Sequence, residues 1–266
     1  MSELTSTSRH QQAARALACL DLTSLNLDDT PERIDALCDR ALVPAPGIEI
    51  HPAAVCIYPR FVGQARSRVH SAGIAVAAVA NFPLGTAPIG EVIEEVEQAL
   101  ADGADEIDVV FPFRAFLAGD REAGAELLRR VGLICHQHTA LLKVILETGV
   151  LHEASTIKEA AQIAVDNGAD FLKTSTGKLE PAATPEAAQA LLEVIVAARG
   201  HRSLGLKVAG GVKTVAEAAA YLDLADRYLH PDQAVPSNFR FGASGLLNDI
   251  VAVLGSSHDT QLSSDY

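Results

Sequence analysis

The chain has 266 residues, enough for two small domains or for one α/β barrel, which commonly reaches this length as a single domain. Hydrophobic residues make up 48% of it, aromatic residues only 5%, and tryptophan is absent, so the core must be aliphatic, as in parallel sheets covered on both faces. The net charge of −13 argues against nucleic acid or an anionic membrane as a partner, because both select basic patches.

The cysteines and the terminal segments indicate the compartment. The cysteines lack CxxC spacing and lie in apolar stretches, so we expect reduced, buried thiols in an intracellular protein. They are Cys19, Cys38, Cys56 and Cys135. The first residues lack the apolar core of a signal peptide, and no stretch approaches the ~18 uninterrupted apolar residues of a membrane helix. We predict a soluble, cytoplasmic protein with a polar tail over about residues 1–12 and a mobile tail over about 255–266.

Apolar runs between turn signals predict strands, and apolar residues at helical spacing predict helices between them. Thr30 and Pro31 provide an N-cap and a first helical residue for the first of these helices. The predicted strands are 17–22, 53–58, 74–82, 105–111, 141–147, 170–175, 204–211 and 238–244. The predicted helices are 31–42, 62–70, 89–101, 123–135, 157–165, 185–199, 215–222 and 245–254.

This alternation predicts the fold. Strands that alternate with helices imply right-handed crossovers and a parallel sheet, and eight such units in about 250 residues match a closed (β/α)8 TIM barrel spanning 1–266 as one domain. The main alternative is an open doubly wound sheet, but no GxGxxG motif follows the first strand. A short echo, DGAD at 102–105 and NGAD at 167–170, starts two strands after the same helix-stop signal.

Lys173 is the first candidate for chemistry. It follows Phe171 and Leu172 at the carboxyl end of a short predicted strand. Burial of a lysine favours the neutral amine, which is the nucleophilic form. An isolated lysine of this kind more often ends a strand and reaches solvent. The chain has only six lysines, however, and three of them interrupt apolar strands: Lys143, Lys173 and Lys207.

Lys173 and Lys207 should be neighbours. Inward positions at the carboxyl ends of barrel strands converge on one cavity, and these lysines lie on the sixth and seventh predicted strands. Two ammonium groups in one pocket repel each other, so the lower-energy state leaves one amine neutral near pH 7. That amine can form a Schiff base with a carbonyl substrate. The alternative is two separately paired structural lysines.

Asp108 is the candidate acid/base group. It lies inside the fourth predicted strand, and Glu106 shares its face by the two-residue period of a strand. A buried carboxylate needs a partner, for which Lys143 and Lys207 are the natural candidates. Such a group can pass protons through water between a substrate and the lysines. This favours catalysis for Asp108, whereas Glu106 fits catalysis and a structural ion pair equally well.

Glycine-rich segments follow the last three predicted strands. Glycines let backbone N–H groups approach an anion closely, and helix amino termini favour negative charge, so we predict a phosphate site there. Its candidate ligands are Gly177, Lys178, Gly210, Gly211, Gly242 and Ser244. His136 and His138 could bind metal, but they lie at a predicted helix end with no carboxylate or third ligand expected nearby. We therefore predict a solvated pair and no metal site; Cys56 is expected to be a packing thiol.

Long segments covering nearly the whole chain carry a family resemblance. They are LDLTSL at Leu20, CIYPRF at Cys56, NFPLG at Asn81, GADEIDVVFPFRA at Gly103, LLKVILETG at Leu141, GADFLKTSTGK at Gly168, LKVAGGV at Leu206, RFGAS at Arg240 and the terminal Tyr266. Together they resemble the class I, Schiff-base deoxyribose-phosphate aldolases. The resemblance implies a Schiff-base lysine at Lys173, a second lysine at Lys207, a relay aspartate at Asp108, and phosphate contacts at the six candidates above.

The resemblance also implies a reaction. It is the reversible cleavage of 2-deoxy-D-ribose 5-phosphate to D-glyceraldehyde 3-phosphate and acetaldehyde, with no metal or organic cofactor. In the synthetic direction Lys173 would condense with acetaldehyde, and Asp108, Lys207 and water would remove a methyl proton. The resulting enamine would attack the phosphorylated aldehyde.

The chain departs from the family at Val208, Lys213 and Gly245, where many members carry proline, arginine and a second serine; the last two bear on phosphate affinity. The family's carboxyl-terminal tyrosine folds over the site to assist proton transfer. Tyr266 could do so, or the tail could never order. Rival functions are another phosphosugar enzyme of the same barrel class, such as a transaldolase-like or isomerase activity, and a non-catalytic phosphosugar-binding barrel. The expected partners are phosphorylated sugars and small aldehydes, and the sequence leaves a homo-oligomer open.

Overall fold

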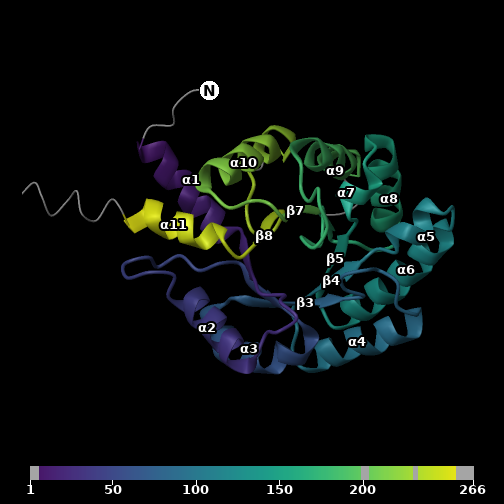
Figure 1. Ribbon diagram of the computed structural model, residues 1–266, viewed down its shortest axis with the longest axis horizontal. Helices are drawn as coiled ribbons and strands as arrows, with labels where there is room; N and C mark the ends of the chain where they lie inside the picture. The colour runs from purple at the N-terminus through teal and green to yellow at the C-terminus, as the bar shows by residue number, and fades with distance from the viewer. Residues whose placement is uncertain (1–5, 199–203, 230–232, 256–266) are drawn as a thin grey trace, which may run out of the picture.

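Eight parallel strands close into a barrel in the order in which they occur along the chain, and helices surround them (Figure 1). The structure, a computed structural model, describes residues 6–198, 204–229 and 233–255. The predicted (β/α)8 TIM barrel is confirmed. The strands are β1 (Leu20–Thr23), β2 (Ala54–Ile57), β3 (Ala75–Ala80), β4 (Glu106–Val110), β5 (Leu141–Ile145), β6 (Phe171–Lys173), β7 (Gly205–Ala209) and β8 (Phe239–Ala243).

One long helix follows each strand, at the positions that the apolar spacing predicts. These helices are α2 (Pro31–Leu42), α3 (Val62–Val69), α4 (Ile89–Ala101), α6 (Arg121–Gln137), α8 (Ala154–Asp166), α9 (Pro185–Ala197), α10 (Val215–Leu229) and α11 (Leu246–Gly255). Four short elements, not predicted, lie in the connections: η1 (Pro59–Phe61), η2 (His70–Ala72), α5 (Phe113–Leu117) and α7 (Thr148–Leu151). Thr30 caps α2 by accepting from Arg33 N, with Pro31 as the first helical residue, as predicted.

The amino-terminal segment differs from the prediction. A polar tail was expected to about residue 12, whereas helix α1 (Ser6–Ala18) begins six residues earlier. It packs against α10 and α11, buries Ala13, Ala16 and Leu17, and places Arg15 Nη2 2.8 Å from Asp226 Oδ1. The first turns of α1 are polar, so tertiary packing rather than apolar periodicity stabilises this helix.

The two copies of the Gly-Ala-Asp echo form the same structure. Gly103 and Gly168 end α4 and α8 with φ of +100° and +103°, in the left-handed region that favours glycine. The aspartates that follow them tie adjacent strands together at the amino end of the barrel. Asp105 Oδ2 accepts from Val76 N at 2.9 Å, and Asp170 Oδ2 accepts from Leu142 N at 2.8 Å.

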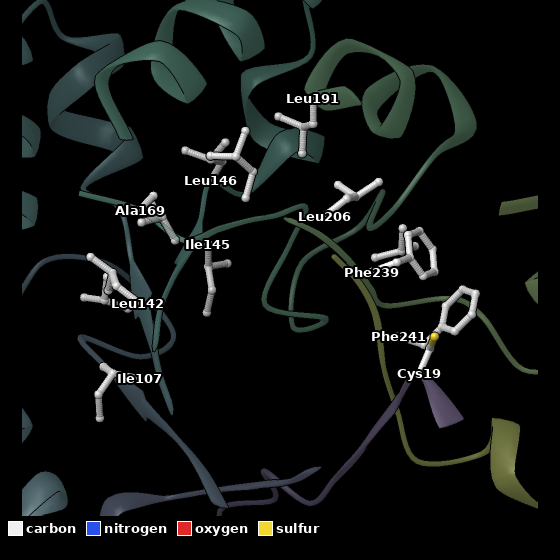
Figure 2. Packing of buried hydrophobic residues seen from close by; sticks show 14 of the residues in the cluster. Cys19, Ile107, Leu142, Ile145, Leu146, Ala169, Leu191, Leu206, Phe239 and Phe241 are labelled. Atoms are coloured by element: carbon white, nitrogen blue, oxygen red, sulfur yellow. The ribbon is translucent and has the colours of Figure 1, made fainter. Parts of the chain in front are cut away.

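The apolar core has two parts. The larger part lies between the strands and the helices, where Phe239 and Phe241 of β8 pack edge to face with ring centroids 4.9 Å apart (Figure 2). A smaller cluster consists of Leu25 and of small side chains of β2 and β3, among them Ala54, Cys56 and Ala77. The cysteines are free and buried, as predicted. The other strands carry ionisable groups inside the barrel, which together form the candidate site.

Candidate active site

The strand register brings the candidate residues together. Lys173 on β6 pairs in register with Lys207 on β7, and Asp108 on β4 pairs with Lys143 on β5. Lys207 in turn pairs with Arg240 on β8. Seven ionisable residues, each no more than 6% exposed, form one network: Asp21, Glu106, Asp108, Lys143, Lys173, Lys207 and Arg240.

Asp108 is the centre of this network. Lys173 Nζ and Lys207 Nζ both donate to Asp108 Oδ2 at 2.7 Å, and Lys143 Nζ donates to Asp108 Oδ1 at 2.8 Å. The expected proximity of Lys173 and Lys207 is confirmed, because one oxygen atom accepts from both. The pairing of Asp108 with Lys143 and Lys207 is also confirmed, and Lys173 is a third partner.

The sequence analysis did not identify two further members of the network. Asp21 on β1 accepts from Lys207 Nζ at 2.5 Å and from Arg240 Nη1 at 2.7 Å. Arg240 Nη2 also donates to Glu106 Oε1 at 2.8 Å, and Glu106 Oε2 contacts Lys143 Nζ. Asp21 and Arg240 each interrupt an otherwise apolar strand, which is the same signal that identified the lysines.

The charge of the network is lowest when one lysine is neutral. Four cations face three carboxylates, so the fully ionised network carries a net charge of +1 in a site with almost no access to water. Uncompensated buried charge is strongly unfavourable. Burial lowers the pKa of Lys173 below its ordinary range, and the charge of Lys207 lowers it further, against the opposing effect of Asp108. Lys173 is thus the amine most easily left uncharged, and burial contributes more to this than the crowding of cations that we expected.

The other lysines of the network stay protonated. Burial alone would lower the pKa of Lys207, but the carboxylates of Asp108 and Asp21 raise it well above its ordinary value. Burial opposes ionisation of Asp108 in the same way, yet Lys143, Lys173 and Lys207 hold its pKa well below the ordinary value. The site therefore combines a readily neutralised amine, a carboxylate and a persistent ammonium group within hydrogen-bonding distance.

Glu147 is a further buried carboxylate, outside the network, which the charge of Lys173 reaches and to which Thr176 donates. Thr176 Oγ1 donates to Glu147 Oε2 at 2.5 Å, and Ser175 Oγ donates to Ala209 O at 2.5 Å. Glu147 is fully buried, and its φ of +56° is unusual for a residue other than glycine. Burial raises its pKa, which hydrogen bonds from Thr176 partly offset. The sequence analysis did not single out Glu147, since nothing in the sequence LLKVILETG indicates its conformation.

A pocket of about 560 Å³ opens from Lys173 toward the glycine-rich loops. Basic side chains line the pocket, and none of the described residues that line it is Asp or Glu, although the whole chain has a net charge of −13. The four basic residues that line it are Arg40, Lys173, Lys178 and Lys213. The predicted phosphate ligands all line this pocket: Gly177, Lys178, Gly210, Gly211, Gly242 and Ser244.

Three of the five glycines that line the pocket have conformations that favour glycine. Gly177, Gly210 and Gly211 have φ between +73° and +87°. A Cβ at Gly210 would lie 2.6 Å from the Cβ of Ala182, so this position excludes a side chain on steric grounds as well.

The amino terminus of α10 contributes less to the predicted phosphate site than expected. Lys213 N and Thr214 N donate to Glu217 Oε2 at 2.8 and 2.9 Å, and Val215 N donates to Asp249 Oδ2 at 2.7 Å. Carboxylates of the chain itself therefore occupy these three donors. Of the two helix termini near the pocket, α11, which begins directly after Gly245, is the better placed to attract an anion.

Comparison with known proteins assigns the family. Residues 15–250 match the family described as DeoC/LacD family aldolase. The chain belongs to the DeoC/LacD aldolase family. As a member of this family it is an aldolase, a carbon–carbon lyase.

Relatives of this aldolase cover almost its entire length. A deoxyribose-phosphate aldolase of Agrobacterium fabrum is 46% identical over 259 residues, which is 96% of each chain. A crystal structure from Toxoplasma gondii ME49, of a protein assigned as a deoxyribose-phosphate aldolase, has a TM-score of 0.83 and 28% identity, covering 95% of this chain and 97% of the other. The deoxyribose phosphate aldolase of Aeropyrum pernix has a TM-score of 0.73 and 22% identity, covering 96% and 99%, and shows the shared fold.

The structure places the three positions at which we expect departures from the family pattern. Val208 is buried in β7, and Lys213 and Gly245 line the pocket. A Cβ added at Gly245 would meet no atom within 4 Å, so a serine would fit there. The pocket thus lacks a hydroxyl at this point without any steric reason. Tyr266 and the predicted carboxyl-terminal tail lie outside the described residues.

The histidines at the end of α6 have different surroundings from those expected. No carboxylate was expected near His136, but its Nε2 lies 2.9 Å from Asp170 Oδ2. His138 Nδ1 contacts Ile134 O instead. Within the described ranges, no group of three or more His, Cys, Asp or Glu residues could hold a metal ion. Over the same ranges, every helix is too short or too polar to cross a membrane.

Proposed function

We propose that this aldolase reversibly cleaves 2-deoxy-D-ribose 5-phosphate to D-glyceraldehyde 3-phosphate and acetaldehyde through a Schiff base on Lys173. The single observation that carries the proposal is the buried Lys173 amine, which shares Asp108 with Lys207 and lines a pocket of cations. The name and 46% identity of the Agrobacterium fabrum relative support the substrate. The proposal involves no metal or organic cofactor.

In the cleavage direction, neutral Lys173 Nζ attacks C1 of the open-chain sugar. The carbinolamine then loses water to give an iminium ion. Asp108 and Lys207 transfer the protons that these two steps require, through water. A base then takes the proton of the C3 hydroxyl, the C2–C3 bond breaks, and C3 becomes the aldehyde carbon of glyceraldehyde 3-phosphate. The electron pair of the broken bond moves to the iminium nitrogen as an enamine, which is protonated at C2 and hydrolysed to acetaldehyde.

The persistent charges around Lys173 suit these steps. Asp108 has its pKa well below the ordinary value, so it can stabilise the cationic iminium ion and return protons delivered through water. Lys207 keeps its proton, so it can act as the acid that protonates the departing hydroxyl. In the synthetic direction the same groups remove a methyl proton from the acetaldehyde iminium ion.

The cationic pocket supports a phosphorylated substrate. Lys178, Lys213 and Arg40 line its walls together with the glycine-rich loops. Backbone N–H groups of such loops and lysine side chains are common phosphate ligands. We assign the 5-phosphate to the part of the pocket formed by these loops, with the reacting carbonyl at Lys173.

The test is reductive trapping. Incubation with acetaldehyde and borohydride should convert Lys173 to N-ethyl-lysine, localised by mass spectrometry of peptides, and should abolish turnover. Lys158, an exposed lysine paired with Glu193, provides the internal control for nonspecific alkylation. Full turnover with unmodified Lys173 would exclude the imine mechanism. Turnover of a different phosphosugar, with Lys173 still trapped, would favour the transaldolase-like alternative.

A further inference from the structure

Glu147 is a buried carboxylate that the proposed reaction leaves unused. It follows β5 and adopts φ +56° and ψ +57°, a left-handed conformation that is unfavourable for a residue other than glycine. The neighbouring strand end holds it there, because Leu146 N donates to Lys173 O at 3.0 Å and Thr148 N donates to Thr174 O at 2.8 Å. The backbone of Glu147 is thus fixed directly beside Lys173.

The carboxylate of Glu147 determines the direction of the Thr176 hydroxyl. Thr176 Oγ1 lies 2.5 Å from Glu147 Oε2, and Thr176 N lies 3.3 Å from the same oxygen. A backbone N–H can only donate, and an ionised carboxylate only accepts, so the one hydroxyl proton of Thr176 goes to Glu147. Lys178 N donates to Thr176 Oγ1 at 3.1 Å. One lone pair of this oxygen remains, and Thr176 lines the pocket.

We propose that Glu147 is a positioning residue that makes Thr176 Oγ1 a hydrogen-bond acceptor for a hydroxyl group of the substrate. The inference rests on the proposed function and adds to it the residue that recognises one hydroxyl group of the substrate. Thr176 lies in the chain between Lys173, where C1 binds, and Gly177 and Lys178 in the phosphate loops. The matching group is the C4 hydroxyl of the sugar, which keeps its proton throughout the reaction and becomes the C2 hydroxyl of glyceraldehyde 3-phosphate.

This arrangement makes the site selective for hydroxylated aldehydes. A site built to bind a hydroxyl discriminates against an analogue that lacks it, because the protein acceptor is then left unpaired. The suitable analogue is 3-phosphooxypropanal, which has the phosphate and the aldehyde but no C2 hydroxyl. Comparing glyceraldehyde 3-phosphate with 3-phosphooxypropanal as acceptors in condensation with acetaldehyde isolates the contact at Thr176.

The decisive variant is Glu147→Gln. Its carboxamide keeps the size of the side chain but can donate to Thr176 Oγ1, which turns the threonine proton toward the pocket. We expect kcat/KM for glyceraldehyde 3-phosphate to fall by roughly 10- to 100-fold, mostly through KM, and that for 3-phosphooxypropanal to change less than about twofold. An equal loss of kcat/KM with both acceptors would overturn the proposal in favour of a purely structural role. Wild-type kcat/KM values with both acceptors would overturn it as well.

Glu95→Gln is the matched control. Glu95 is a half-buried carboxylate whose pKa burial also raises, and it accepts from Asn81 N at 2.9 Å, but it lines a different pocket. Its substitution should leave the ratio of the two acceptors unchanged. Should Glu147→Gln not fold, the pair Thr176→Val and Thr176→Ser decides. Valine should remove the preference for the hydroxylated acceptor and serine should keep it; equal ratios in both would refute the inference.

Trapping of acetaldehyde on Lys173 separates the two hypotheses. An adduct on the wild-type chain, together with an acceptor ratio that Glu147→Gln does not change, would refute only the role of Glu147. Absence of the adduct, with turnover intact, would refute the imine mechanism itself. In the double variant Glu147→Gln with Thr176→Val, the two losses should not add, because both act on one hydroxyl group.

Discussion

The two ends of the barrel differ in the surroundings of the polar residues that the Gly-Ala-Asp motif places there. In each copy of Gly-Ala-Asp, the aspartate lies at the amino end and a second polar residue follows three positions later at the carboxyl end. Asp105 is partly exposed and pairs with Arg66 Nη1 at 2.5 Å, whereas Asp108 is fully buried among three ammonium groups. In the second copy, Asp170 ties two strands together and Lys173 enters the site.

The difference between the ends comes from access to water. At the amino end, solvent screens ion pairs such as that of Asp105 with Arg66, so each such pair contributes at most about 1 kcal/mol to stability. Toward the carboxyl end, the charges of the network around Asp108 are buried, so each depends on its partners and their pKa values move apart. Position along a strand, rather than residue type, thus separates structural from reactive groups, and five predictions test this comparison.

The largest effect should come from Asp108→Asn. The variant removes the central anion and leaves three buried lysines that all donated to it. We expect the free energy of unfolding to fall by about 3–5 kcal/mol and kcat to fall by roughly 10²- to 10⁴-fold. Denaturant unfolding and steady-state kinetics measure the two effects. Wild-type values in both would mean that Asp108 is not the centre of the site.

Lys207→Leu should abolish most turnover while the fold stays intact. We expect kcat to fall by roughly 10²- to 10³-fold, because the variant removes the proposed acid near Lys173. It also removes a charge that lowers the pKa of Lys173, so the pH at which this amine becomes nucleophilic should rise. Imine trapping as a function of pH measures the shift. Lys158→Leu is the control, and retained activity in Lys207→Leu would contradict the assigned role.

The pH dependence of activity should follow Lys173. Because its pKa lies below 10.5, kcat/KM should rise with pH through a value lower than that of an ordinary lysine. Between the two values the unfolded chain binds a proton that the folded chain lacks, so the contribution of Lys173 to the free energy of unfolding increases with pH. A rise in kcat/KM that begins only near pH 10.5 would show that the pKa of Lys173 is not lowered.

Lys213→Gln should affect phosphate binding alone. We expect KM for the phosphorylated substrate to rise about tenfold, equivalent to about 1.4 kcal/mol, with kcat/KM for unphosphorylated 2-deoxyribose unchanged. Arg33→Gln is a suitable control because Arg33 pairs with Asp28 outside the pocket. Equal losses with both sugars would mean that Lys213 supports the fold rather than the phosphate.

The smallest effect should come from Asp105→Asn at the amino end. The pair with Arg66 is partly exposed, so we expect a loss of about 1 kcal/mol in the free energy of unfolding and an unchanged kcat. Thermal unfolding and kinetics on one preparation measure both. A fall in kcat comparable to that of Asp108→Asn would remove the distinction between the two ends of the barrel.

The sequence predicted the barrel and the central triad because these depend on local patterns. Alternating apolar runs define the strands, and Asp108, Lys173 and Lys207 are charges inside such runs. Parallel register then makes them neighbours without further information. The same signal was present at Asp21 and Arg240, and closure of the predicted barrel, which pairs β8 with β1, brings these two residues within 2.7 Å, so both could have been predicted as well.

Other features depend on tertiary structure that no local pattern encodes. The left-handed backbone of Glu147 results from hydrogen bonds to β6, and α1 forms because α10 and α11 cover its apolar side. At the start of α10, Thr214 and Glu217 satisfy the pattern of a capping box, which could have indicated that these donors are already used. Helix starts near a predicted anion site therefore need a check for acidic residues in their first turn.

The position of Arg240 in the last strand has a consequence for synthesis of the protein. Until residues 239–243 leave the ribosome, Asp21 and Glu106 have no guanidinium partner, and the wall between β1 and β7 is open. A nascent chain of seven strands would therefore carry carboxylates that lack their guanidinium hydrogen bonds in an unsealed interior, which disfavours premature compaction. The buried ionic network and the completed fold should thus arise together, once the eighth strand has been synthesised.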